Sequence, residues 1–111
     1  MNSPPSERIA LLQVLAFSGF FFLDRAGLGE SYGNQAVILR EWGRLGDAMA
    51  LAQKTEAIFT ELSDSMGLVA SYGNQMSILR DLGSPDEALA ILQKQEAICV
   101  ELGDRAKLGW I

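Results

Sequence analysis

The stretch "SYGNQ" stands at residues 31–35, and the same five residues stand again at residues 71–75. Moving the chain by forty positions lays residues 27–64 over residues 67–104 without a gap, and 21 of these 38 positions are identical. A repeat period of about 20–50 residues is typical of solenoid proteins, in which each unit buries its apolar face against its neighbours. The sequence therefore predicts a repeated structural unit of forty residues.

Each unit begins with a predicted amphipathic helix, over residues 27–42 and again over residues 67–82. Its apolar residues are spaced four and three apart, which places them on one face of a helix. This stripe consists of Tyr32, Ala36 and Leu39 in unit one and of Tyr72, Met76 and Leu79 in unit two. Glycine follows each helix, at residues 43 and 83, where a left-handed C-terminal cap favours it.

The second helix of each unit follows this glycine and is expected to run to about residue 62 or 102. In "SPDE" (84–87), Ser84 is expected to cap the helix, Pro85 suits its first turn, and Glu87 completes a capping box. Unit one has "RLGD" there, which predicts a looser start. A short loop that contains Asp64 or Asp104 is expected after each second helix.

The segment "YGNQMSILRDLGSPDEALAILQ" (72–93) resembles a tetratricopeptide repeat. It has a large first-helix residue, a turn glycine and the second-helix pair Ala88 and Leu92; the matching residues of unit one are Tyr32, Ala36, Leu39, Gly43, Ala48 and Ala52. The forty-residue period resembles the long-helix repeats of kinesin light chains and of many bacterial proteins. Gln35 and Gln75 depart from the family pattern, which has an apolar residue there. The resemblance implies an all-α fold, a right-handed α-solenoid of antiparallel helix pairs with about two and a half repeats.

The N-terminal residues fit the same array. "PSERIALLQ" (5–13) lies over "PDEALAILQ" (85–93), which predicts that residues 1–24 form a degenerate, apolar half repeat resembling a second helix. The expected division is then unit one at 25–64, unit two at 65–104, and the start of a truncated unit at 105–111. Two alternatives stay open for residues 9–23: a signal or membrane anchor, for which the apolar run is short and its flank poorly basic, or an unstructured apolar tail.

Solenoids generally need about three repeats and polar caps at both ends, and this sequence shows neither. We therefore expect apolar surface at both ends of the array. Such patches are partner surfaces or aggregation hazards, so a homo-oligomer that stacks through its ends is a possible assembly. The residues concerned are Phe20, Phe21, Phe22, Trp110 and Ile111.

Composition argues against catalysis. The chain has no histidine, which removes the commonest general base and the commonest metal ligand. It has no phosphate-binding loop, no paired cysteines and no acidic cluster with metal spacing, so we expect no enzyme activity, cofactor or metal. Cys99 lies in an apolar helical run and is expected to be a buried small side chain, with a reactive thiol as the alternative.

The resemblance places the binding surface on the first helices, which line a concave groove for peptides or partner helices. It assigns Asn34 and Asn74 to that groove, where a carboxamide can pair with a peptide backbone whatever the side chains are. Arg40 and Arg80 could bind a carboxylate, although Arg40 could instead pair with Glu30 or Glu41. The other expected groove residues are Gly33, Gly73, Val37 and Ser77. The two Asn residues could also serve packing alone.

The expected function is a protein–protein interaction module, a scaffold or adaptor. The net charge of −5 argues against nucleic acid and anionic membranes as partners. Bacterial repeats that resemble these often belong to longer proteins, which implies a bacterial, cytoplasmic chain that could be a fragment or a decayed copy of one. Export through residues 9–23 is the alternative location.

Overall fold

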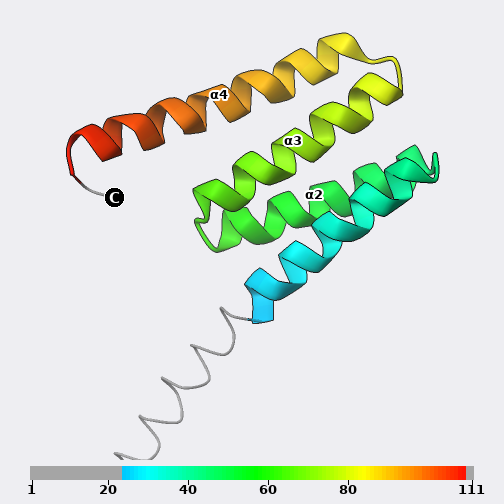
Figure 1. Ribbon diagram of the computed structural model, residues 1–111, viewed down its shortest axis with the longest axis horizontal. Coiled ribbons are helices and arrows are strands. Elements are labelled where there is room, and N and C mark those ends of the chain that lie inside the picture. The colour runs from blue at the N-terminus through cyan, green and yellow to red at the C-terminus, as the bar shows by residue number, and fades with distance from the viewer. Residues whose placement is uncertain (1–23, 110–111) are drawn as a thin grey trace, which may run out of the picture.

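The computed structural model describes residues 24–109, which form four helices and contain no strand. A first helix at 24–41, called helix 24–41, is followed by α2 (Leu45–Glu61), α3 (Ser65–Asp81) and α4 (Pro85–Lys107). Successive helices run in opposite directions and are joined by tight turns (Figure 1). The described part of the chain is therefore all-α, as the sequence predicted.

Each described helix packs on its neighbours along the chain. α3 packs on both α2 and α4, and helix 24–41 contacts both α2 and α3. The best-buried core residues are mostly small, which lets the helix axes approach closely: Ala36, Ala48 and Ala52 are 0% exposed, and Ile78 is 1% exposed. Leu39, Leu45, Met49 and Leu51 pack around them. The predicted helical stripes thus lie on the packed face, with Tyr32 and Tyr72 half-buried.

The three turns between helices share one hydrogen-bond pattern. Gly43 and Gly83 have φ of 77° and 76°, so both residues adopt the left-handed conformation that their positions predicted. After helix 24–41, the amide of Gly43 donates to the Arg40 carbonyl (2.9 Å) and that of Arg44 to the Leu39 carbonyl (2.8 Å). These two bonds form a Schellman motif.

The third turn, at residues 62–64, uses Ser63 in the left-handed conformation, with φ of 53°. Its amide donates to the Thr60 carbonyl (3.1 Å), and the Asp64 amide donates to the Phe59 carbonyl (2.9 Å), which repeats the Schellman pattern. Asp64 then caps α3, because its carboxylate accepts a hydrogen bond from the Gly67 amide at 3.0 Å. The loop predicted at Asp64 is therefore present.

The corresponding loop at Asp104 is absent, so that prediction was wrong. α4 continues through Asp104 to Lys107. The residues after Leu62 are "SDSMG", whereas those after Leu102 are "GDRAK", and Arg, Ala and Lys are strong helix formers. An ion pair between Arg105 and Glu101, one turn apart, adds to this.

The predicted capping box of α4 does not form either. Ser84 occupies the N-cap position and Pro85 begins the helix, as expected, but the Ser84 side chain accepts no capping hydrogen bond. Its backbone has ψ of 68°, outside the β region from which an N-cap side chain usually reaches the third helical amide. α2 begins at Leu45, which is the same register forty positions earlier.

Cys99 is exposed, which corrects the expectation of a buried thiol. In the described chain α4 packs on α3 and makes no comparable contact with α2, and Cys99 lies on an exposed part of α4. The predictions for the N-terminal half repeat, for the apolar segment 9–23 and for Phe20, Phe21, Phe22, Trp110 and Ile111 lie outside the described residues. Between residues 24 and 109, no helix combines the length and apolarity needed to cross a membrane.

Candidate functional site

A groove of about 520 Å³ runs between helix 24–41 and α3, with α2 beneath it. Helix 24–41 contributes one wall, α3 the other, and Thr55 and Phe59 of α2 the base. The groove is lined by small and apolar side chains with a few polar groups between them, which is a composition typical of ligand sites. Its remaining lining residues are Ala26, Gly29, Glu30, Gly33, Asn34, Val37, Asp64, Met66, Gly67, Ala70, Ser71 and Asn74.

The two asparagines predicted to bind a ligand line this same groove, one from each wall. Asn34 is exposed and Asn74 is half-buried. The two walls approach each other near Gly33, where a Cβ would meet the Nδ2 atom of Asn74 at 3.9 Å and the Thr55 side chain at 3.8 Å. A larger side chain at Gly33 would therefore narrow the groove beside the Asn74 carboxamide.

A small extension of about 20 Å³ continues between the same two helices, lined by Val37, Arg40, Asn74 and Ser77 among others. The Arg40 guanidinium is already occupied at this end. Its Nε donates to Asp81 at 2.6 Å and its Nη2 lies 3.4 Å from the other carboxylate oxygen, which forms a two-point pair across helices. This hydrogen bond raises the pKa of Arg40 and lowers the pKa of Asp81 from its ordinary value of 3.8.

The structure places the two remaining predicted residues away from the groove. A Cβ on Gly73 would meet the side chain of Gln95 at 3.6 Å, so this glycine faces α4. Arg80 is exposed and lines neither the groove nor its extension. Of the eight predicted groove residues, the structure therefore brings together Gly33, Asn34, Val37, Arg40, Asn74 and Ser77.

The charge of the groove comes from carboxylates. Among the described residues that line it, the charged ones are Glu30 and Asp64, and Asp64 also caps α3. The nearest basic group named in its extension, Arg40, is neutralised by Asp81. A ligand with a positive charge at the Glu30 end is therefore favoured over an acidic one.

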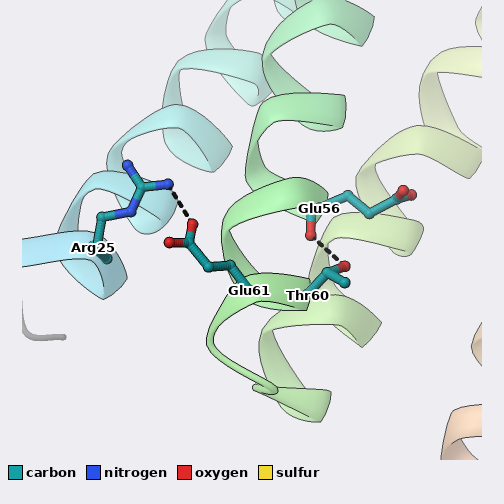
Figure 2. Close-up of polar contacts among 4 residues, drawn as sticks. All are labelled: Arg25, Glu56, Thr60 and Glu61. Atoms are coloured by element: carbon teal, nitrogen blue, oxygen red, sulfur yellow. Dashed lines mark hydrogen bonds and ion pairs between the residues drawn. The ribbon is translucent and has the colours of Figure 1, made fainter.

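Polar contacts lie beneath and beside the groove. Arg25 of helix 24–41 pairs with Glu61 of α2 at 2.8 Å, which joins these two helices, whereas the Thr60 hydroxyl donates to the Glu56 carbonyl at 2.8 Å within α2. Figure 2 shows both contacts, with the Glu56 side chain pointing away from helix 24–41 and toward α3. The Thr55 hydroxyl donates to the Leu51 carbonyl at 3.0 Å beneath the groove.

Sequence reasoning missed a buried polar contact between α2 and α3. The Ser71 hydroxyl donates to the Ala52 carbonyl at 2.9 Å, and the Gln75 carboxamide donates to Glu56 at 3.0 Å. Ser71 is 0% exposed and Gln75 is 3% exposed. Burial, with the Glu56 carboxylate nearby, also raises the pKa of Tyr72. The repeated Ser and Gln of "SYGNQ" were the available signal.

No group of residues with metal-ligand character occurs between residues 24 and 109. Comparison of the chain with protein-family models, with curated proteins and with solved structures finds no match.

Proposed function

We propose that this chain is a protein-interaction module of the tetratricopeptide type, a right-handed α-solenoid that binds an extended peptide segment of a partner between helix 24–41 and α3. One observation carries the proposal: Asn34 and Asn74, forty positions apart in the sequence, line opposite walls of a single groove. Each carboxamide offers donors and an acceptor, which suits the repeating N–H and C=O groups of a peptide.

The rest of the groove supports a ligand with apolar side chains and a basic end. Val37 and Met66 are exposed apolar side chains at its walls, and Phe59 lies at its base. Such side chains supply most of the area that a bound peptide buries, while polar groups set its orientation. The carboxylate of Glu30 favours Lys, Arg or an amino terminus at that end.

The proposal is tested by selecting binders from a phage-displayed library of random peptides against the full chain, and by titrating the selected peptides. Asn34→Ala with Asn74→Ala removes two neutral hydrogen bonds, each worth about 1 kcal/mol, so Kd should rise about 30-fold. Gln53→Ala with Gln93→Ala is the matched control, since both are exposed amides outside the groove. Equal Kd values for the parent and the asparagine variant would exclude the groove as the peptide-binding site.

A second variant separates loss of binding from loss of fold. Ala70 is exposed and lines the groove, so Ala70→Trp should fill it without disturbing the core. Ala50→Trp places the same side chain on an exposed position of α2 that does not line the groove. We expect the first variant to lose peptide binding and both to keep the helical circular dichroism spectrum of the parent.

A further inference from the structure

Two hydrogen bonds, one buried and one partly buried, set the register in which α3 packs on α2. Ser71 donates to the backbone carbonyl of Ala52 at 2.9 Å, and Gln75 donates to the carboxylate of Glu56 at 3.0 Å. The Gln75 amide also lies 3.4 Å from the Ser71 hydroxyl, so the two side chains are held together. Buried polar groups of this kind favour one alignment of the helices, because any other leaves them without partners.

Two further contacts accompany this alignment. A Cβ on Gly67 would stand 2.4 Å from the Phe59 ring, so the ring sits in the space that glycine leaves. At the other end of α3, Asp81 pairs with Arg40 at 2.6 Å. The α3 residues in these four contacts, called the docking set, are Gly67, Ser71, Gln75 and Asp81.

Helix 24–41 carries a corresponding set forty positions earlier. Gly27, Ser31, Gln35 and Glu41 hold the same positions, and all four are exposed. The Gln35 amide donates to the Ser31 hydroxyl at 3.2 Å, which repeats the arrangement of Gln75 and Ser71. Within residues 24–109, Glu41 forms no ion pair. A second docking set is therefore formed on helix 24–41, and no described residue covers it.

The matching receptor positions are also exposed, at the other end of the row of helices. Leu92, Glu96 and Cys99 of α4 stand forty positions after the α2 residues that receive α3, and all are exposed. Arg80 stands forty positions after Arg40, and in the described part of the chain it too forms no ion pair. Leu92 is equivalent to Ala52 of the first unit. Ala52 is 0% exposed because α3 covers it, whereas the larger apolar side chain of Leu92 is 40% exposed.

The receptor residues differ in size between α2 and α4. Leu92 is larger than Ala52, and Cys99 is smaller than Phe59, so the bulky and the small position exchange order on α4. No described atom lies within 4 Å of a Cβ built on Gly27. The face of helix 24–41 is therefore open at the point where α3 receives the Phe59 ring.

We propose that helix 24–41 of a second copy of this chain docks on α4 in the register that α3 adopts on α2. Glu41 of the second copy then faces Arg80, as Asp81 faces Arg40, and its Gln35 faces Glu96. Opposite charges and complementary hydrogen-bonding groups at the two ends point to a copy of the same chain as the occupant. Because the two surfaces differ, the contact is head-to-tail and continues into an open filament.

This docking would also create a second groove. Gly73 and Asn74 would form one wall and Asn34 of the second copy the other, as Gly33 and Asn34 face Asn74 within one chain. The proposal does not depend on peptide binding in the first groove, because it rests on contacts at the outer helices.

Light scattering on the full chain over a range of concentrations tests the proposal. We expect the mass of the parent to rise with concentration. Gly27→Trp should abolish that rise, since an indole is larger than the space left where Cys99 stands in place of Phe59, whereas a small side chain still fits there. Gly46→Trp is the matched control: no described atom lies within 4 Å of its Cβ, and it belongs to neither surface. A parent that stays monomeric, or a Gly27→Trp variant that assembles like it, would overturn the proposal.

A charge exchange tests the register. Arg80→Glu or Glu41→Arg alone replaces attraction by repulsion and should weaken association about tenfold. The two single variants mixed together should assemble again, because each contact between them has opposite charges. Failure of the mixture to recover, while each variant keeps its helical spectrum, would show that these residues do not face each other.

A disulfide gives a covalent readout of the same alignment. The Cβ of Gly67 would lie 2.4 Å from Phe59 Cγ, and Cγ is one bond of about 1.5 Å from Cβ, so the two Cβ atoms come within about 4 Å, as a disulfide requires. Gly27→Cys should therefore crosslink to Cys99 of another copy under copper–phenanthroline oxidation and give a ladder of covalent multimers. Gly46→Cys is the control. A Gly27→Cys variant that gives no more multimers than this control would overturn the register.

Discussion

Gln75 and Gln35 hold equivalent positions forty residues apart, yet Gln75 is 3% exposed, whereas Gln35 is exposed. The difference arises from the neighbours, because α3 packs on α2 through Gln75 and no described helix covers Gln35. The same side chain therefore has a structural role in one unit and an open surface in the other.

Gln75→Ala should lower the free energy of unfolding by about 1–3 kcal/mol, since it removes a buried hydrogen bond and leaves a cavity beside Glu56. Gln35→Ala should change it by less than about 0.5 kcal/mol, as is usual for exposed positions. Urea unfolding followed by circular dichroism, at a concentration where the chain is monomeric, measures both. Similar values for the two variants would contradict the burial of Gln75.

Gly67→Ala should also be destabilising, by about 1–3 kcal/mol, because its methyl group would overlap the Phe59 ring and one of the two must move. Gly103→Ala is the control within a helix. No described atom lies within 4 Å of a Cβ on Gly103, so alanine fits there, and its higher helix propensity than that of glycine should stabilise the chain by up to about 1 kcal/mol. Thermal unfolding of the two variants should therefore shift in opposite directions.

Ser63→Gly should stabilise the chain by about 1 kcal/mol. Ser63 has φ of 53°, and the left-handed conformation costs a residue with an L side chain about 1–2 kcal/mol, a cost that glycine avoids. Part of this gain is lost, because glycine gives the unfolded chain more conformational entropy. The reverse change at an equivalent turn, Gly43→Ala, should be destabilising by a similar amount. A neutral Ser63→Gly variant would mean that the Ser63 side chain makes up for its backbone conformation.

Acid should weaken the contact between helix 24–41 and α3. The hydrogen bond from Arg40 lowers the pKa of Asp81, so this carboxylate contributes stability above its ordinary pKa of 3.8, and the contribution is lost as pH falls through the lowered value. The destabilisation by Asp81→Asn should therefore be largest near neutral pH and shrink in acid. If the ion pair causes this pH dependence, adding Asp81→Asn to an Arg40→Gln variant should change the free energy of unfolding little at any pH.

The repeat and the helix periodicity predicted much of the fold. They gave four helices over the described residues, the left-handed glycines at residues 43 and 83, and the stripe that holds Ala36 and Leu79 in the core. These features are local, since they depend on spacing within about one turn of helix. The prediction ended α4 near residue 102, by analogy with the second helix of unit one, whereas α4 continues to Lys107. The high helix propensity of "DRAK" was not taken into account.

Features that depend on a neighbouring helix could not be predicted in this way. Periodicity shows that Gln75 and Gln35 lie on the same helix face, but only the packing shows that one is covered. Asn34 and Asn74 were expected in a common groove because of the resemblance to tetratricopeptide repeats, and both line the groove between helix 24–41 and α3. Arg40 was expected to pair within its own unit or with a ligand, and its partner is Asp81 of the next.

The three turns at residues 43, 63 and 83 divide the chain at intervals of twenty, and each helix touches those nearest to it in sequence. In the described chain, the hydrogen bonds between side chains span at most the 41 positions from Arg40 to Asp81. Contact order is therefore low, and chains of this kind fold in microseconds to milliseconds because little loop entropy is lost before contacts form. A pulling force should therefore unfold such a chain one helix hairpin at a time, and the chain should refold quickly when the force is removed.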